Sequence, residues 1–93
     1  MREKKIEQQL VKEVKDIGGI ALKIASPGFD GMPDRLILLP NRKLAFVEVK
    51  APGKTLRPLQ EKRKRQLEAL GFLVFCLDHI DQIGGILHEI QAS

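Results

Sequence analysis

Leu44-Ala45-Phe46-Val47-Glu48-Val49-Lys50 is a segment of β-branched and aromatic residues with two charges inside it. This composition predicts a strand. Side chains alternate between the two faces of a strand, so Glu48 and Lys50 share a face and lie roughly 7 Å apart along it. Burying either charge costs several kcal/mol unless a partner or a metal compensates it. We therefore expect either an exposed salt bridge at the end of the sheet or a functional site.

A second acid, Asp34, favours the functional site. Residues 34–39 are predicted to form the preceding strand, which begins directly after the Gly31-Met32-Pro33 bend. A turn at 40–43 makes the two strands an antiparallel hairpin, which sets Asp34 near Lys50 and beside Glu48. Two carboxylates that converge with a lysine suit Mg²⁺ or Mn²⁺. Such a site can hydrolyse a phosphodiester, because the metal lowers the pKa of a bound water and positive charge stabilises the transition state.

The remaining elements complete an α/β pattern. Apolar residues three or four positions apart predict a helix over 2–17, which ends at Gly18-Gly19. The continuous apolar run 72–77 is typical of a central strand covered on both faces. We expect one domain over residues 1–93, in the order α-β-β-β-α-β-α, with a mixed sheet flanked by helices. The other elements are a strand over 20–24, a loop over 26–33, a helix that begins near Pro58 and is stopped by Gly71, and a helix over 81–91.

The composition excludes several classes of protein. The 93 residues hold one modest core, and 43% hydrophobic with 30% charged residues is an ordinary globular balance. No apolar run is long enough to span a membrane, and the charged start Met1–Lys5 is unlike a signal peptide, so we expect a cytoplasmic protein. The single cysteine, Cys76, cannot form an internal disulfide and is expected to be buried.

The charge pattern favours a polyanionic partner. The net charge is +4, and seven basic residues lie between positions 50 and 65 against the single acid Glu61. A solvated helix face would give the same pattern. With four Phe and no Trp or Tyr, we expect contact with the phosphate backbone rather than base stacking. The expected DNA contacts are Lys54, Arg57, Lys62, Lys64 and Arg65.

Two further polar residues are candidates on the predicted helices. Glu7 lies beside Ile6 at the border of the buried stripe, although most glutamates in such positions are solvated. Gln60 and Lys64 share one helix face at i, i+4 spacing and could reach the scissile phosphate. His79 and His88 lie outside the expected acidic cluster, and with no cysteine pair to assist them a zinc site is not expected.

The motifs together resemble the VRR-NUC domain, a family of virus-type replication-repair nucleases within the PD-(D/E)XK superfamily. The resemblance rests on Gly31-Met32-Pro33-Asp34-Arg35, on Phe46-Val47-Glu48-Val49-Lys50-Ala51-Pro52-Gly53 and on Gln60, and it covers nearly the whole chain. It implies an α-β-β-β-α-β core and a catalytic set of Glu7, Asp34, Glu48, Lys50 and Gln60. Of these, Glu7, Asp34 and Glu48 would bind the metal together with the carbonyl of Val49, and Lys50 would position the water.

One position departs from the family pattern. Arg57 stands where the family tends to have a serine before Pro58. A serine would cap the helix and arginine cannot, so the change affects local helix stability rather than the chemistry.

The resemblance implies a Mg²⁺-dependent, structure-selective DNA endonuclease of a bacterial or phage-infected cell, with Mn²⁺ as an alternative metal. Stand-alone domains of this kind resemble junction-resolving nucleases that act as homodimers, and a two-fold dimer suits the two symmetric strands of a four-way (Holliday) junction. Two alternatives stay open. The chain could be a non-catalytic basic DNA-binding module, or a PD-(D/E)XK nuclease with another preference, such as flap or restriction-type substrates.

Overall fold

The computed structural model describes all residues 1–93 and confirms the expected order of elements. Helix α1 (Glu3–Asp16) is followed by strands β1 (Ile20–Lys23), β2 (Arg35–Leu39) and β3 (Lys43–Val49). Helix α2 (Pro58–Ala69), strand β4 (Val74–Leu77), a single turn of 3₁₀ helix η1 (Ile80–Gln82) and helix α3 (Ile83–Ala92) complete the chain. The α/β class is confirmed, and the 3₁₀ turn is an addition to the prediction.

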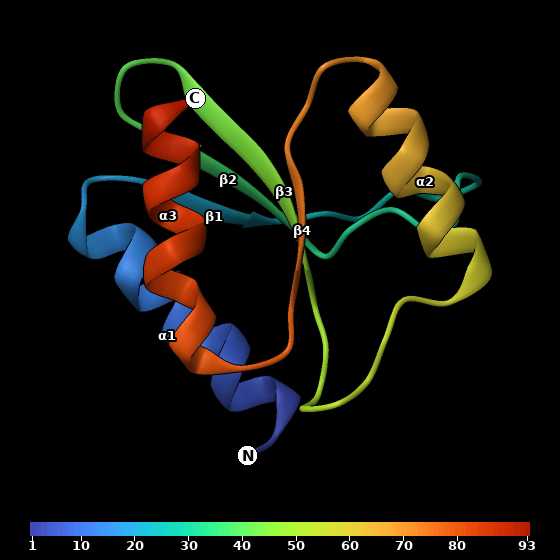
Figure 1. Ribbon diagram of the computed structural model, residues 1–93, viewed down its shortest axis with the longest axis horizontal. Coiled ribbons are helices and arrows are strands. Elements are labelled where there is room, and N and C mark those ends of the chain that lie inside the picture. Colours follow the sequence, from blue (N-terminus) through green and yellow to red (C-terminus); the bar gives the residue numbers. More distant parts are fainter.

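The four strands form one mixed sheet in the order β1-β2-β3-β4. β1, β2 and β3 are antiparallel neighbours, whereas β4 runs parallel to β3 (Figure 1). The expectation that the run 72–77 forms a central strand is wrong, because β4 lies at the edge of the sheet. Its apolar sequence reflects helices on both of its faces, since α3 and α2 pack on opposite sides of the sheet (Figure 1).

The hydrophobic core lies on the face of the sheet that α1 and α3 cover (Figure 1). α1 contributes one helical stripe, Ile6, Leu10 and Val14, each 0% exposed. The sheet presents alternate residues of β2 and β3 to this stripe, because their side chains point to one face. The buried core residues of the two strands and α3 are Ile37, Leu39, Ala45, Val47, Val49, Ile83, Ile86, Leu87 and Ile90.

The other face of the sheet is much less covered. α2 lies on this side, apart from the pair α1 and α3 (Figure 1), and its single buried residue is the polar Gln60. The intervening residues of β3, Phe46 and Glu48, point to this side of the sheet, since they alternate with the core residues. The buried carboxylate of Glu48 therefore lies on the side of the sheet that faces α2.

A tight turn fixes the register of the central hairpin. Asn41 and Arg42 both have positive φ, 66° and 64°, in the turn between β2 and β3. Left-handed residues in such a turn match the twist of the two strands. The register pairs Leu39 with Lys43 and Arg35 with Val47. A shift by one residue would turn every side chain of β3 to the other face, Glu48 included.

The helix boundaries follow the signals in the sequence. Pro58 is the first residue of α2, where its fixed φ suits the helix. The helix stops before Gly71, whose φ of 97° requires glycine. None of the helices is long and apolar enough to cross a bilayer.

Candidate active site

Asp34 and Glu48 lie side by side at the end of the β2–β3 hairpin. The ladder pairs Arg35 with Val47, and the same register one step further sets Asp34 opposite Glu48. Opposite residues in an antiparallel pair have Cβ atoms about 4.5–5.5 Å apart. Asp34 is held in place by both neighbouring strands. Its Oδ2 accepts a hydrogen bond from Val49 N at 3.0 Å, and its carbonyl accepts one from Ile24 N at 2.8 Å.

Glu48 is the more deeply buried of the two acids, with 5% of its surface exposed. Its Oε2 accepts a hydrogen bond from Gln60 Nε2 at 3.1 Å and lies 3.6 Å from Lys50 Nζ. Its Oε1 is buried and has no hydrogen-bond partner. Buried oxygens nearly always have a donor or a cation beside them, so this atom points to a ligand-binding role.

The environment of Glu48 favours its neutral form. Burial, followed by the charge of the neighbouring Asp34, raises the pKa of Glu48 from 4.5 to about 7, while Lys50 acts in the opposite direction. Two carboxylates placed opposite each other repel when both are ionised. A cation between them would favour the ionised form of both carboxylates and so offset burial and their repulsion.

Lys50 and the carbonyl of Val49 complete this end of the sheet. The Lys50 side chain is 14% exposed and shares the face of Glu48, as the alternation along the strand predicts. The N–H of Val49 points to Asp34. In a strand the N–H and C=O of one residue point to the same edge, so the Val49 carbonyl also faces Asp34.

Gln60 connects the start of α2 to the acidic pair. Its Oε1 accepts a hydrogen bond from Arg57 N at 2.9 Å, while its Nε2 donates to Glu48. Arg57 makes no side-chain cap of its own, as its lack of an acceptor predicts. Gln60 therefore both replaces part of the missing cap and orients Glu48.

Glu7 does not join these groups in the structure. It accepts a hydrogen bond from Arg35 Nε at 3.1 Å and lies 3.9 Å from Lys23 Nζ. Arg35 alternates with Asp34 along the chain, so the ion pair lies on the α1 side of the sheet while Glu48 lies on the α2 side. No group of three or more His, Cys, Asp and Glu side chains converges anywhere in the chain. The structure thus brings together two of the three expected acids, and a metal-binding role for Glu7 stays a prediction.

Arg35 is a residue whose contacts the sequence did not reveal. Besides Glu7 it binds the carbonyl of Ala21, through Nη1 at 3.1 Å. It thereby ties α1 and β1 to the strand that carries Asp34. Arg35 belongs to the Gly31–Arg35 motif, but the motif does not predict that its side chain binds Glu7 and Ala21.

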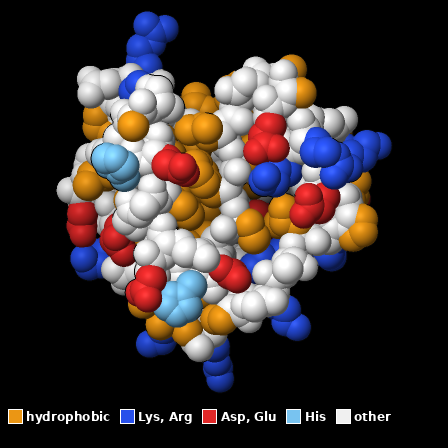
Figure 2. Space-filling view, in the orientation of Figure 1, with side chains coloured by type: hydrophobic (Ala, Val, Ile, Leu, Met, Phe, Trp, Pro, Cys, Tyr) orange, Lys and Arg blue, Asp and Glu red, His pale blue; other side chains and the backbone are white.

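The expected DNA contacts lie on and before α2. Lys54, Arg57, Lys62 and Arg65 are exposed and form no salt bridge, whereas Lys64 lies 3.2 Å from Glu68. Figure 2 shows basic side chains over α2, with acidic ones among them. Two open hollows lie beside the start of α2: Gln60 lines the first, and Cys76, the ladder partner of Glu48, lines the second. One of 510 Å³ includes Arg57 and Gly31, and one of 350 Å³ includes Lys54 and Lys64.

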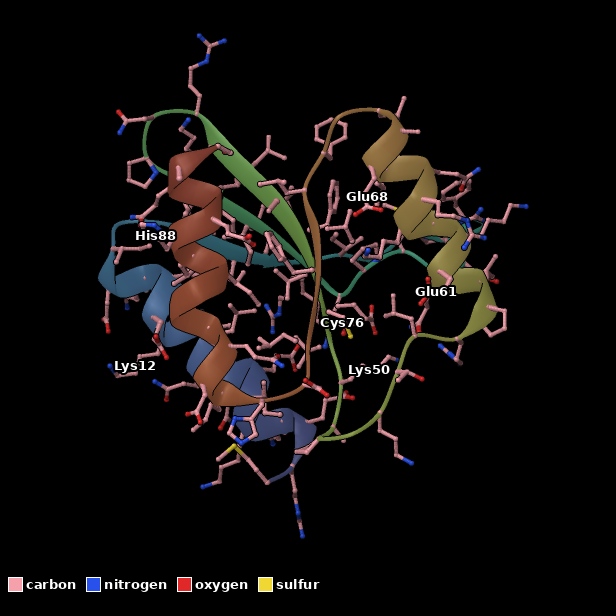
Figure 3. The ribbon with its side chains drawn as sticks, viewed as in Figure 1. Lys12, Lys50, Glu61, Glu68, Cys76 and His88 are labelled. Atoms are coloured by element: carbon pink, nitrogen blue, oxygen red, sulfur yellow. The ribbon has the colours of Figure 1, made fainter.

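Cys76 lies beside the site rather than in the core. The parallel ladder pairs it with Glu48, and Figure 3 shows Cys76 and Lys50 on the same side of the sheet as α2, with Glu61 on the helix. Burial, with Asp78 as the next cause, raises the pKa of the Cys76 thiol. A neutral thiol is a poor nucleophile, so we assign it no chemical role. His88 lies on α3, on the opposite side of the sheet (Figure 3).

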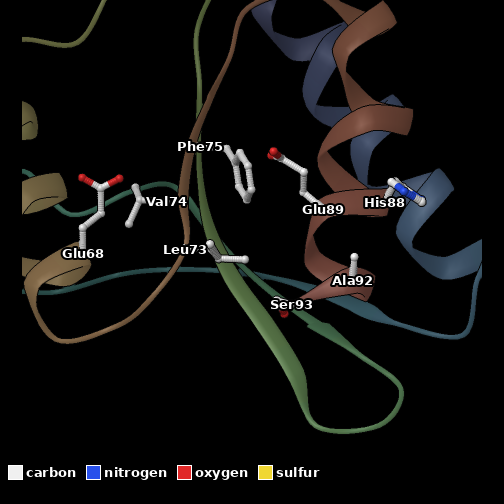
Figure 4. Close-up of a pocket in the computed structure, with 8 residues that line it drawn as sticks. All are labelled: Glu68, Leu73, Val74, Phe75, His88, Glu89, Ala92 and Ser93. Atoms are coloured by element: carbon white, nitrogen blue, oxygen red, sulfur yellow. The ribbon is translucent and has the colours of Figure 1, made fainter.

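The groove drawn in Figure 4 is separate from the acidic pair. It has a volume of 390 Å³ and runs along β4 between α2 and α3, with Leu73, Phe75, His88 and Glu89 among its lining residues. None of Asp34, Glu48 and Lys50 lines it. The candidate active site therefore lies at the end of the β2–β3 hairpin, outside this groove.

Comparisons with known proteins point to nucleases. No family model matches the chain. A protein of Acyrthosiphon pisum secondary endosymbiont phage 1, described as "Putative nuclease p44", is 53% identical over 81 residues, which are 87% of each chain. A solved structure described as "VRR_NUC domain" is similar with a TM-score of 0.87 and 25% identity, over 92% of this chain and 94% of that chain.

Proposed function

Because the chain belongs to the VRR-NUC family of nucleases, we propose that it is a Mg²⁺-dependent, structure-selective DNA endonuclease. Its substrate would be a four-way junction or related branched DNA. The observation that carries the proposal is the pairing of the half-buried Asp34 with the buried Glu48, one oxygen of which has no partner. The proposed catalytic residues are Asp34, Glu48 and Lys50, and Gln60 positions Glu48.

The residues fit a hard divalent cation. Carboxylate and carbonyl oxygens are the ligands that Mg²⁺ and Mn²⁺ prefer. Asp34 lies opposite Glu48 at the end of the hairpin and accepts the N–H of Val49, and the buried Oε1 of Glu48 has no partner, which supports a cation at this place. When bound, the cation would activate water and offset the charge that develops on the phosphate. Glu7 would reach this place only after its ion pair with Arg35 opens.

The side chains around the pair have distinct roles in this proposal. Gln60 holds Oε2 of Glu48 through Nε2, which fixes the rotamer of a carboxylate that would otherwise turn away from its acidic neighbour. Lys50, at 3.6 Å from the same oxygen, is near enough to hold a water and to bring positive charge to the phosphate. Arg57 and Lys54 border the two hollows on either side and can bind phosphates of the same strand.

A homodimer fits both the proposed substrate and the surface. The chain of 93 residues offers little basic surface, and a two-fold dimer would double it and supply two sites for the two strands of a junction. On β1, Ile20 and Leu22 are 57% and 45% exposed on the less covered side of the sheet. Exposed apolar side chains of this size favour a protein partner, and we propose a second copy.

The proposed function is tested by incubating the protein with a four-way junction, a flap and a linear duplex. Cutting of the junction is expected in Mg²⁺ and Mn²⁺, and binding without cutting in Ca²⁺. Glu48→Gln and Lys50→Ala should each lower the cleavage rate at least ~100-fold. Glu13→Gln is the matched control, because Glu13 lies on α1 and bonds only to Gln9. Activity that survives Glu48→Gln would contradict the assignment.

The non-catalytic alternative makes a different prediction. A basic module would bind DNA through α2 with strong salt dependence, without a divalent metal and without cleavage. A flap or restriction-type nuclease would use the same acids and Lys50 but would cut the flap or the linear duplex in preference to the junction. The same substrate panel therefore distinguishes all three.

A further inference from the structure

We propose that a small apolar hollow between the 26–33 loop and α2 binds an unpaired nucleobase of the DNA next to the cleavage position. The proposal rests on the nuclease function and adds a feature of the substrate to it. The hollow has a volume of 210 Å³ and is lined by Phe29, Met32, Arg63, Gln66, Leu67 and Leu70. One water needs about 10–15 Å³ on this measure, so the hollow has room for a planar heterocycle.

The hollow is lined by an exposed aromatic ring, that of Phe29, on which a base can stack. Phe29 is 47% exposed, and the guanidinium carbon of Arg63 lies 3.8 Å from its ring centroid. The cation covers one face of the ring and leaves the rest of the ring accessible. Nucleobases stack on such aromatic rings whatever their sequence. The four Phe of the sequence do not by themselves predict this ring, because a count does not show where each Phe lies.

The polar groups of the hollow suit a base joined to a phosphate chain. Arg63 donates from Nε to the carbonyl of Asp30 at 2.8 Å and from Nη1 to Gln66 Oε1 at 3.0 Å. It has no carboxylate within salt-bridge distance, so its charge is available to an anion. The amide nitrogen of Gln66 makes no hydrogen bond and can donate to an edge of the base.

The loop is held firmly, close to the acidic pair. Gly31 has a φ of 89°, and a Cβ there would lie 2.8 Å from Leu59 Cγ, so the loop packs tightly on the first turn of α2. Met32 is two residues from Asp34, and Phe29 is five residues from it. Five residues span at most roughly 18 Å, the length of a few nucleotides. The ring can therefore contact the strand that is cut.

The positive charge around the hollow favours a nucleobase as its occupant over an apolar side chain from a second copy of the chain. Lys62, an exposed cation without a salt bridge, lies on α2 one turn before Gln66 of the hollow, and Arg57 directly precedes the helix. Burying this surface against another basic protomer would bring like charges together, whereas DNA would neutralise them. The exposed Ile20 and Leu22 on β1 offer a second copy a surface with fewer charges.

Fluorescence of 2-aminopurine tests the proposal. The probe is a four-way junction with 2-aminopurine at successive positions around the branch, bound in Ca²⁺ so that no cleavage occurs. We expect the protein to quench the probe at one or two of these positions. Phe29→Ala should abolish that quenching and raise KM for junction cleavage in Mg²⁺ by roughly tenfold or more, with kcat little changed, and Phe29→Trp should restore both. Phe72→Ala, which removes another half-exposed Phe, is the control.

Two results would overturn the proposal. In one, Phe29→Ala leaves both the quenching and KM as in the wild type while the junction is still cut, which would refute the base site and spare the nuclease function. In the other, Phe29→Ala changes the sedimentation of the protein and not the quenching, which would assign the hollow to contact between two copies. Failure of the wild type to bind or cut any DNA would instead contradict the proposed function, and the base site with it.

Discussion

Replacing Glu48 by Gln should make the metal-free protein more stable at neutral and alkaline pH while it abolishes cleavage. The Glu48 carboxylate is 5% exposed, faces Asp34 and has one oxygen without a partner. Glutamine keeps the shape of the side chain and can still accept the hydrogen bond from Gln60, and its amide has no charge to desolvate. The variant loses the contact of Glu48 with Lys50, which is the weaker influence at this position.

The size of the effect follows from the pKa of Glu48. Burial and Asp34 raise it from 4.5, the value in an unfolded chain, to about 7 in the folded protein. Between these pH values the folded state binds more protons than the unfolded state, so the free energy of unfolding falls as the pH rises. The stabilising contribution is complete below pH 4.5 and is lost as the pH passes about 7. At about 1.4 kcal/mol for each pH unit, the loss between pH 4.5 and about 7 is about 3 to 4 kcal/mol.

Urea unfolding in EDTA across a pH series measures this difference. The unfolding free energy of Glu48→Gln relative to wild type should rise by about 3 to 4 kcal/mol between pH 4 and pH 8, or roughly 15–30 °C in Tm for a domain of this size. Glu13→Gln should run parallel to the wild type. If the Glu48→Gln curve also ran parallel to the wild type, Glu48 would be an ordinary solvated carboxylate whose pKa folding does not raise.

Three other substitutions give separate predictions. Lys50→Ala should lower the cleavage rate ~100-fold or more while binding of the junction in Ca²⁺ stays within about threefold of wild type, and a loss of binding in Ca²⁺ would show that Lys50 only holds DNA. Gln60→Ala should cost about 1–3 kcal/mol in urea unfolding, because a buried carboxylate and the N-cap amide both lose a partner; a neutral result would mean that neither hydrogen bond matters. Gly31→Ala should cost more than ~1 kcal/mol, because of its positive φ and the clash with Leu59, whereas Gly85→Ala, with open space around it, should be neutral or slightly stabilising.

The order of elements and the acidic pair could be predicted because both depend on local patterns. Alternation along residues 44–50 placed Glu48 and Lys50 on one face, and the hairpin brought Asp34 to them. The prediction that β4 is a central strand was wrong because a continuous apolar run indicates that both faces of a strand are covered. It does not indicate whether the strand has one neighbour or two. The parallel pairing that sets Cys76 beside Glu48 is a long-range contact with no local signal.

The position of Glu7 on its helix could be predicted from the sequence, but the partner of its carboxylate could not. Helix periodicity places it correctly at the border of the buried stripe, where it is half-buried. Whether its carboxylate turns toward the acids or toward a cation depends on Arg35, whose side chain emerges on the α1 face. Phe29 is comparable, since its exposure depends on a loop conformation that Gly31 and Arg63 fix together.

Anomalous X-ray scattering from crystals grown with Mn²⁺ would test the account most directly. The prediction is a peak within about 2.0–2.6 Å of oxygens from Asp34 and Glu48, near the carbonyl of Val49, and its loss in Glu48→Gln. A peak at other groups, or saturating Mn²⁺ with none between these two carboxylates, would contradict the proposed metal site and the hydrolytic mechanism built on it.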